Sequence, residues 1–279
     1  MITQKGVPMG TEITITRPDD WRLNLSDGKQ ITNLLEHSTS RFRRALIAPG
    51  MTTVALASEY RQRILAVVPN GVEFIPLMVL RITPETPWCE IFNARECNFI
   101  CALETETIID HHSLYRMMSL LTAAESMDFP ISINFGVTDP CDGKSIIDNA
   151  LYEMVYDLPN LRININTSTD MEHTAKFVES AGKKVTATIA VQHLLSNKML
   201  KAATSGNPRF FLGTGATHAS LELCAEEFAS IGRLDMLEGF ASHFGADFFR
   251  VPRNTSTITL VREDWVMPTG QMIKWKIKE

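Results

Sequence analysis

The sequence predicts an α/β protein of the (β/α)8 TIM barrel class, in which eight strands alternate with helices. Three observations support this prediction. Eight short apolar or β-branched runs recur along the chain, and amphipathic stretches separate them. A length of 279 residues also suits one barrel without a second domain. The whole chain, residues 1–279, is therefore predicted to be a single TIM-barrel domain with a short amino-terminal arm.

The arm is predicted at 12–16, where apolar and polar residues alternate ahead of the barrel. The barrel strands are predicted at 22–25, 45–48, 74–80, 99–103, 131–135, 161–165, 185–190 and 209–212. The stretches between them show helical periodicity. Two apolar stripes are predicted to face the core, one of Ile146, Ile147, Ala150, Leu151, Met154 and Val155 and one of Leu221, Ala225, Phe228 and Ile231.

The composition limits the kinds of partner that we expect the protein to bind. The net charge of −5 is mild, and Lys and Arg do not cluster with aromatic residues, so we expect no nucleic-acid partner. No run of 18 apolar residues occurs and residues 1–12 lack an apolar leader, so we expect no membrane partner and a cytoplasmic protein. The five cysteines (89, 97, 101, 141 and 224) lack zinc-ribbon spacing, which favours reduced thiols.

One segment closely resembles a known family. Residues 17–28 read Arg-Pro-Asp-Asp-Trp-Arg-Leu-Asn-Leu-Ser-Asp-Gly. In the short, homodimeric bacterial dihydroorotases of the amidohydrolase superfamily, the same stretch reads Arg-Pro-Asp-Asp-Trp-His-x-His-Leu-Arg-Asp-Gly. Further blocks follow in the family's order, at 52–54, 60–65, 76–78, 187–189, 192–194, 211–214 and 260–263, together with Trp275 near the carboxyl end. The resemblance implies an amidohydrolase-type barrel and a homodimer.

The resemblance also places the family's metal ligands on residues that do not bind zinc. The two histidines of the first strand fall on Arg22 and Asn24. An arginine stays protonated and offers only hydrogen-bond donors, and an asparagine amide is a poor substitute for imidazole. The bridging carbamylated lysine falls on or beside Leu103, two further histidines fall on Asn134 and Asn166, and the aspartate falls on Gly215. We therefore expect no metal and no other cofactor.

The family's substrate contacts are altered as well. The arginine and asparagine that hold the substrate carboxylate fall on Ser26 and Gly50, whereas a histidine that contacts the substrate is retained as His218. The loop before the last barrel strand is also shortened to 195–208. His218 is thus the only candidate catalytic residue, and no catalytic residue is firmly assigned.

Function in barrels of this class lies at the carboxyl ends of the strands. The residues expected there are mostly polar and rarely titrate near neutral pH: Arg22, Asn24, Ser26, Gly50, Arg81, Glu104, Asn134, Asn166, Gln192, Thr214 and His218. From this set we predict a ligand-binding group that would suit a small anionic molecule, namely Arg22, Asn24, Ser26, Asn134, Asn166 and His218.

Each candidate also has a purely structural interpretation. Arg22 and Asn24 alternate with apolar residues, so both should point into the barrel. Arg22 then either binds an anion in place of the zinc charge or pairs with Glu104 or a nearby aspartate, and the second is favoured because buried charges are nearly always paired. Asn134 and Asn166 either orient a ligand or, as favoured, bond each other and trapped water.

Other histidines are expected to be structural. Retention of His193 favours a packing role. The Asp110-His111-His112 run and the His218/Glu222 pair are not expected to bind metal, because two ligands do not make a site.

The leading functional hypothesis is a dihydroorotase-like protein that has lost its zinc site and its activity and is retained for binding a small molecule or a partner. Two alternatives stay open. One is a metal-independent enzyme that acts on an amide, imide or carboxylate-bearing molecule, with Arg22, the two asparagines and His218 at its site. The other is a structural subunit.

Overall fold

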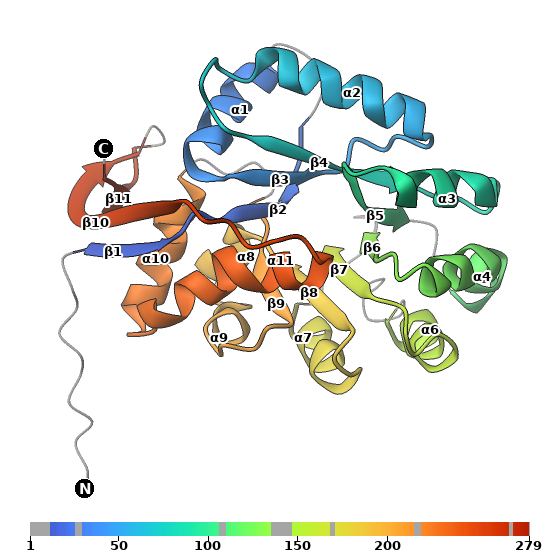
Figure 1. Cartoon of the computed structure of the whole chain (residues 1–279). Coiled ribbons are helices and arrows are strands. Elements are labelled where there is room, and N and C mark those ends of the chain that lie inside the picture. Colours follow the sequence, from blue (N-terminus) through green and yellow to red (C-terminus); the bar gives the residue numbers. More distant parts are fainter. Residues whose placement is uncertain are drawn as a thin grey trace, which may run out of the picture.

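The computed structural model describes residues 12–25, 30–105, 110–134, 147–167, 171–214, 219–267 and 270–278. Eight parallel strands form one sheet in the order β2-β3-β4-β5-β6-β7-β8-β9, which curls into a nearly closed barrel with helices around it (Figure 1). The predicted fold class is confirmed.

The barrel strands are β2 (Asp19–Leu23), β3 (Arg44–Ile47), β4 (Ile75–Arg81), β5 (Ile100–Thr105), β6 (Ile131–Asn134), β7 (Ile163–Thr167), β8 (Val185–Ile189) and β9 (Phe210–Leu212). All eight overlap a predicted run. The first strand differs most, since it begins at Asp19 and ends at Leu23 rather than running from 22 to 25.

The helices are α1 (Gln30–Arg41), α2 (Val54–Val67), α3 (Trp88–Glu96), α4 (His111–Ser126), α6 (Tyr152–Asp157), α7 (Met171–Ser180), α8 (Val191–Leu195), α9 (Leu200–Ala203), α10 (Ser220–Ser230) and α11 (Phe244–Phe249). Short π-helices occur at η1 (Ile147–Leu151) and η3 (Gly239–His243), with a 3₁₀ turn at η2 (Leu234–Met236). None of the described helices is long and apolar enough to cross a membrane.

Both predicted apolar stripes face the core, with one exception. In the first stripe Ile147, Ala150, Leu151 and Met154 are buried and Val155 is partly buried, while Ile146 lies outside the described residues. In the second stripe Ile231 is 46% exposed, because it follows the last residue of α10 and the helical periodicity no longer applies to it.

A second, smaller sheet joins the two ends of the chain. The strand predicted at 12–16 is present as β1 (Glu12–Thr16), and it pairs antiparallel with β10 (Thr257–Val266), which pairs in turn with β11 (Met272–Ile277). The three strands lie together beside the barrel, on the left in Figure 1. Trp275 of β11 is 1% exposed, so this sheet contributes to the main core.

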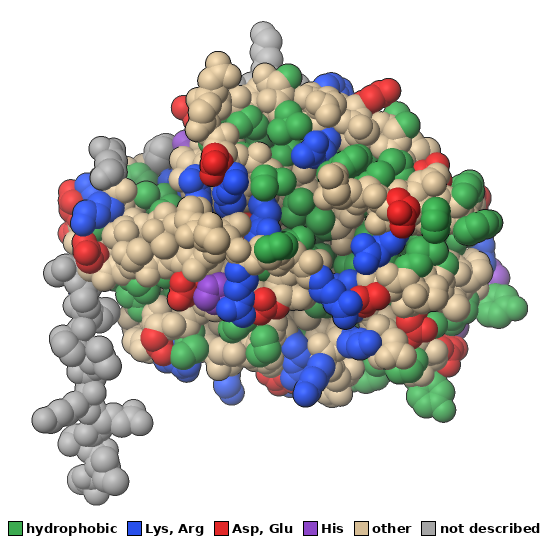
Figure 2. All heavy atoms as spheres, in the orientation of Figure 1, with side chains coloured by type: hydrophobic (Ala, Val, Ile, Leu, Met, Phe, Trp, Pro, Cys, Tyr) green, Lys and Arg blue, Asp and Glu red, His purple; other side chains and the backbone are tan. Residues whose placement is uncertain are grey.

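The described cysteines Cys89, Cys97, Cys101 and Cys224 are free thiols, as predicted, and Cys141 lies outside the described residues. Acidic and basic side chains are interspersed on the face shown in Figure 2.

The barrel interior has an apolar layer at its amino-terminal end. Strand residues Trp21, Leu46, Leu77, Val79, Ala102 and Phe211 pack there with Ala246 and Phe249 of α11. The Trp21 and Phe249 rings stack with centroids 4.7 Å apart, so α11 closes this end of the barrel. Arg22, Glu104 and Asn166 lie toward the opposite, carboxyl-terminal end of the barrel, which we call the mouth.

Candidate functional site

A β-bulge in β2 turns two consecutive side chains into the barrel. Asp20 pairs with Ala45 and Leu23 pairs with Ile47, so Trp21 and Arg22 together oppose the single residue between those partners on β3. Trp21 packs in the apolar layer, whereas Arg22 reaches across to β7. Asn24 follows the end of β2 and is exposed, so the alternation expected for Arg22 and Asn24 does not hold.

A hydrogen bond to the backbone fixes the Arg22 side chain among the strand ends, and a glycine leaves room for it. Its Nη1 donates to the backbone oxygen of Asn166 at 2.9 Å. A Cβ placed on Gly213 would lie 2.7 Å from the Arg22 Cβ and 2.3 Å from Cγ2 of Thr188, so only glycine leaves room for Arg22 here. Burial lowers the pKa of Arg22, and the carboxylates of Glu104 and Asp20 oppose that shift.

A second arginine approaches the mouth from β4. Arg81 and Glu104 are paired residues of adjacent strands, and Arg81 Nη2 lies 3.2 Å from Glu104 Oε1. The Glu104 side chain is 1% exposed and that of Arg81 is 34% exposed. Gly50, with φ of +77°, lies against this guanidinium, since a Cβ there would be 3.1 Å from Arg81 Cζ.

This pair corrects one sequence-based expectation. Glu104 forms its ion pair with Arg81, not with Arg22 as expected, because Arg81 is its neighbour across the sheet. Leu103 packs in the outer core, so Glu104 is the residue of β5 that faces the barrel interior where the family's lysine was placed.

The β7 and β8 side of the mouth contains a closed amide and hydroxyl network. Asn164 Nδ2 donates to Asn166 Oδ1 at 2.6 Å and to Thr188 Oγ1 at 2.9 Å, and Thr186 Oγ1 donates to Asn164 Oδ1 at 3.2 Å. The Asn166 amide oxygen therefore bonds Asn164 and not Asn134, in contrast to the favoured expectation. Asn134 Oδ1 is buried without a hydrogen-bond partner among the described residues.

Asp20 joins the last strand to the first. Its Oδ1 accepts from Thr214 N at 2.8 Å and from Arg22 N at 3.0 Å, and its Oδ2 accepts from the Thr214 hydroxyl. Asp20 is fully buried, and burial raises its pKa despite these hydrogen bonds. Its contacts stabilise the closure of the barrel.

Among the remaining candidates, the structure describes His193 but not Ser26, Gly215 or His218. His193 begins the connection after β8, and burial lowers its pKa, with a smaller contribution from Arg22. Its Nδ1 is buried without a partner in the described part of the chain. Ser26, Gly215 and His218 lie outside the described residues, so the role of His218 stays a prediction.

The metal-like pairs have structural roles. Asp110 caps α4 by accepting from Ser113 N, with a reciprocal bond from its own N to the Ser113 hydroxyl. Glu222 is buried and accepts two hydrogen bonds from Arg41, at 2.9 and 2.5 Å. Asp110 and Glu222 therefore each have a structural partner, and whether these residues bind metal stays a prediction.

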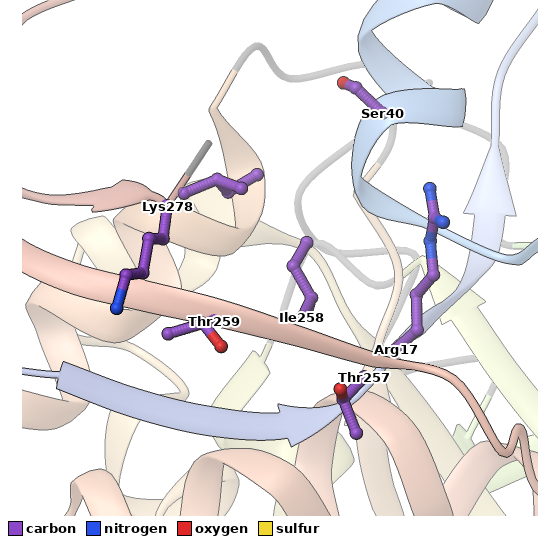
Figure 3. A pocket seen from close by; sticks show the side chains of 7 residues that line it. Arg17, Ser40, Thr257, Ile258, Thr259 and Lys278 are labelled. Carbon is purple, nitrogen blue, oxygen red and sulfur yellow. The ribbon is translucent and has the colours of Figure 1, made fainter.

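A hollow of about 410 Å³ lies away from the mouth, between β10, the end of β11 and α1 (Figure 3). Arg17 and Lys278 lie on opposite sides of it, and Ile258 lies between them. Arg17 Nη2 donates to Thr39 O at the carboxyl end of α1, and Lys278 pairs with Glu12 at 2.9 Å. These cations therefore have structural partners.

The eight parallel strands form a nearly closed TIM barrel whose mouth is lined by polar side chains. Its structure is similar to dihydroorotase from Campylobacter jejuni, with a TM-score of 0.84, 16% identity and coverage of 96% of this chain and 97% of that one. It also resembles L-hydantoinase from Arthrobacter aurescens, with a TM-score of 0.74, 9% identity and coverage of 95% and 83%. At these identities the likeness shows the fold.

The chain belongs to the dihydroorotase family. It is 35% identical to the dihydroorotase of Microcystis aeruginosa over 343 aligned positions, which cover 96% of this chain and 99% of the relative. It is also 35% identical to that of Laribacter hongkongensis over 320 positions, with 92% of each chain covered. No family model matches the chain. Because 343 positions exceed the 279 residues of this chain, the Microcystis relative contains internal segments that it lacks.

Three described residues at the mouth are positively charged or already hydrogen-bonded within the protein. Arg22 places a guanidinium there, Asn166 Oδ1 already accepts from Asn164, and Glu104 already accepts from Arg81. Within the described ranges, no group of three or more His, Cys, Asp or Glu side chains is arranged to hold a metal ion.

Proposed function

We propose that this member of the dihydroorotase family is catalytically inactive as a dihydroorotase and uses its barrel mouth to bind a small anionic molecule. The observation that supports the proposal most is the position of Arg22. Its guanidinium lies in the barrel interior, donates to Asn166 O, and occupies the position that aligns with the family's first zinc-binding histidine. The exchange replaces a neutral metal ligand with a fixed positive charge.

The remaining carboxylates at the described mouth support the loss of hydrolysis. Metal-assisted hydrolysis needs an activated water and a group that accepts its proton. Asp20 accepts hydrogen bonds from Thr214 and Arg22, and Glu104 accepts from Arg81. Both carboxylates are thus already engaged with groups of the protein.

Elemental analysis of the purified protein tests the proposal together with an assay for interconversion of dihydroorotate and carbamoyl aspartate in added zinc. We expect substoichiometric metal and no turnover. Because Cys89 is exposed and thiolates bind zinc, Cys89→Ser serves as a control for adventitious metal. One or more zinc ions per chain in that variant, or any zinc-dependent turnover, would overturn the proposal.

A thermal-shift screen separates a binding protein from a purely structural subunit. A ligand that binds only the native state at a hundred times its Kd adds about 2.7 kcal/mol of stability. Selective stabilisation by small anions favours the proposed function, whereas no response to any small molecule favours the structural alternative. Product formation in a metal-free sample would favour the metal-independent enzyme.

We also propose that the protein is a homodimer, on the basis of the dimeric branch that its sequence resembles. Sedimentation equilibrium at micromolar concentration should give twice the chain mass of 31.2 kDa. A single species at the chain mass would contradict this proposal.

A further inference from the structure

We propose that the outer face of α3, α4 and α6 binds a second copy of this chain, with the two α4 helices packed antiparallel across a two-fold axis. This inference rests on the homodimer of the proposed function and names the surface that forms it. We call this surface the aromatic face and define it by Trp88 and Phe92 of α3, Tyr115 of α4, and Tyr152 and Tyr156 of α6.

Within the described part of the chain, exposed aromatic side chains occur on this face alone. Their exposed fractions run from 46% for Tyr152 to 85% for Tyr156. The six other large hydrophobic residues that are exposed are aliphatic and lie elsewhere in the chain. The three helices follow one another down the right side of Figure 1, and hydrophobic side chains project on that side in Figure 2. Single apolar residues are normal on a surface, whereas a patch of them marks an interaction site.

The spacing of the aromatic residues places their rings on neighbouring helix faces. Trp88 and Phe92 are four residues apart, and so are Tyr152 and Tyr156, so each pair lies on one side of its helix. Helix α4 lies between α3 and α6, because it packs on α3 and its first residue contacts a glutamate of α6. The two pairs of rings therefore flank α4 and its exposed Tyr115.

The aromatic face is large enough for a stable dimer. An aromatic side chain presents about 150 to 250 Å², so the exposed fractions of the five side chains correspond to roughly 500 to 800 Å² of surface. A specific interface buries about 800 Å² on each of its two components. The five side chains thus supply most of the area that one copy contributes, and aromatic residues are enriched at the centres of such interfaces.

The outward stripe of α4 has the same spacing in either direction. Tyr115, Ser119, Thr122 and Ser126 are exposed and follow one another at intervals of four, three and four residues. When two α4 helices pair antiparallel about a two-fold axis, Tyr115 of each copy lies opposite Ser126 of the other, and Ser119 lies opposite Thr122. A large side chain then meets a small one at each end of the contact, so the helices can approach closely.

The hydroxyl groups of this stripe can be buried at little cost. Thr122 Oγ1 donates to Met118 O, and Ser126 Oγ donates to Ala123 O, each at 2.8 Å within α4. Burial of a polar group costs free energy when the group loses its hydrogen bonds to water without replacement. These two hydroxyls keep their hydrogen bonds when water leaves, so the stripe suits a contact between proteins.

The charges around the aromatic face favour a protein over a nucleic acid or an anionic membrane. The helices α3, α4 and α6 contain two Lys or Arg residues, Arg95 and Arg116. Arg116 pairs with Glu85 at 2.8 Å, and Arg95 donates to a backbone oxygen just after α4. Glu96 and Asp157, the last residues of α3 and α6, are exposed. Polyanions require clustered basic groups and would be repelled by these carboxylates.

Sedimentation velocity of the full chain over a range of concentrations tests the face with two single variants and their combination. Tyr115→Glu and Ser126→Lys should each raise the dissociation constant of the dimer about tenfold or more, because each places a charge in the apolar contact on both copies. The double variant sets each introduced carboxylate opposite an introduced ammonium group of the other copy, so dimerisation should recover in part. Within one chain the two positions are about 16 Å apart along α4, so recovery requires the second copy.

Ser230→Lys is the matched control and should leave the dimer unchanged. Ser230 is the exposed last residue of α10, and its hydroxyl donates to Glu227 O three residues earlier, as that of Ser126 does within α4. Circular dichroism and thermal denaturation establish that each variant is folded. Tyr115→Ala adds no charge and should also weaken the dimer, because it removes the ring that meets the small end of the other α4.

The outcomes separate this inference from the homodimer itself. A dimeric wild type that neither Tyr115→Glu nor Ser126→Lys weakens would overturn the aromatic face, while the homodimer would stand. Weakening by both single variants without recovery in the double variant would overturn the antiparallel pairing of α4. A wild type at the chain mass of 31.2 kDa would instead contradict the homodimer of the proposed function.

Discussion

Two arginine–carboxylate pairs lie in the same barrel interior and differ in almost every respect. At the amino-terminal end, Arg44 binds Asp19 with both its Nε, at 2.9 Å, and its Nη2, at 2.6 Å. Its third nitrogen donates to Pro252 O, and Asn254 donates to Asp19. At the mouth, Arg81 Nη2 lies 3.2 Å from Glu104 Oε1.

The two pairs also differ in the exposed fraction of their arginine side chains. The side chains of Arg44 and Asp19 are 8% and 1% exposed, so both charges are sealed, whereas Arg81 is 34% exposed above a sealed Glu104. A sealed, bidentate pair with additional hydrogen bonds has no capacity left for a ligand, and its role is structural. Arg81, by contrast, reaches solvent above a buried carboxylate.

Trp21 and Arg22, the two residues of the bulge in β2, likewise contribute to different ends of the barrel. Trp21 contributes to the apolar layer that α11 closes, and Arg22 contributes to the mouth. Stability and binding are therefore separated along the barrel axis, and substitutions at the two ends should have different effects.

The largest effect is expected at the sealed pair. Arg44→Met should lower the free energy of unfolding by about 3 to 5 kcal/mol, because it leaves the buried Asp19 carboxylate without its cation. Urea denaturation followed by circular dichroism measures this change. A loss similar to that of Arg81→Met would show that the two pairs do not differ as described.

A smaller loss is expected from Gly213→Ala. The new methyl group would overlap Thr188 Cγ2 at 2.3 Å and the Arg22 Cβ at 2.7 Å, and overpacking of this kind costs about 1 to 3 kcal/mol. Anion binding should weaken as well, because Arg22 is displaced. The double variant with Thr188→Ser removes one of the overlapping groups and should recover part of the stability. No recovery would indicate that Thr188 is not the source of the strain.

Arg22→Met should cost less stability, about 1 kcal/mol, since it removes a hydrogen bond to a backbone oxygen and leaves Glu104 paired with Arg81. Near-native denaturation together with lost anion binding is the expected result. A loss of 3 to 5 kcal/mol without any ligand in the wild type would show that Arg22 only neutralises the mouth.

The smallest effect is expected for Asp20→Asn, and it should depend on pH. Burial raises the pKa of Asp20 above its unfolded value, so the folded protein binds its proton more tightly and stability decreases as pH rises through this range. An asparagine can still accept from Thr214 N and has no charge to bury. The variant should therefore be as stable as the wild type or more stable at neutral pH, and this advantage should shrink in acid. Chemical denaturation at several pH values checks the sign.

The sequence by itself determined the barrel. Local periodicity predicts its eight strands, the strand at β1 and the inward-facing apolar stripes of its helices. This periodicity depends only on which residues are apolar. The family followed from short blocks such as 211–214. The sequence also showed Arg22 where the resemblance places a metal-binding histidine, because this is a difference of residue type at an aligned position.

Only the tertiary structure decided which groups meet at the mouth. Regular alternation of side chains along a strand predicted that Arg22 and Asn24 both point into the barrel. The structure instead has a bulge that turns Trp21 and Arg22 inward, and this bulge depends on how the residues of β2 pair with those of β3. Arg22 was expected to pair with Glu104 or a nearby aspartate, yet Glu104 pairs with Arg81 because β4 lies next to β5. Likewise, β10 was not predicted, and its pairing with β1 joins residues from opposite ends of the chain. Periodicity is a property of neighbours in sequence, whereas ion pairs and sheet register depend on neighbours in space.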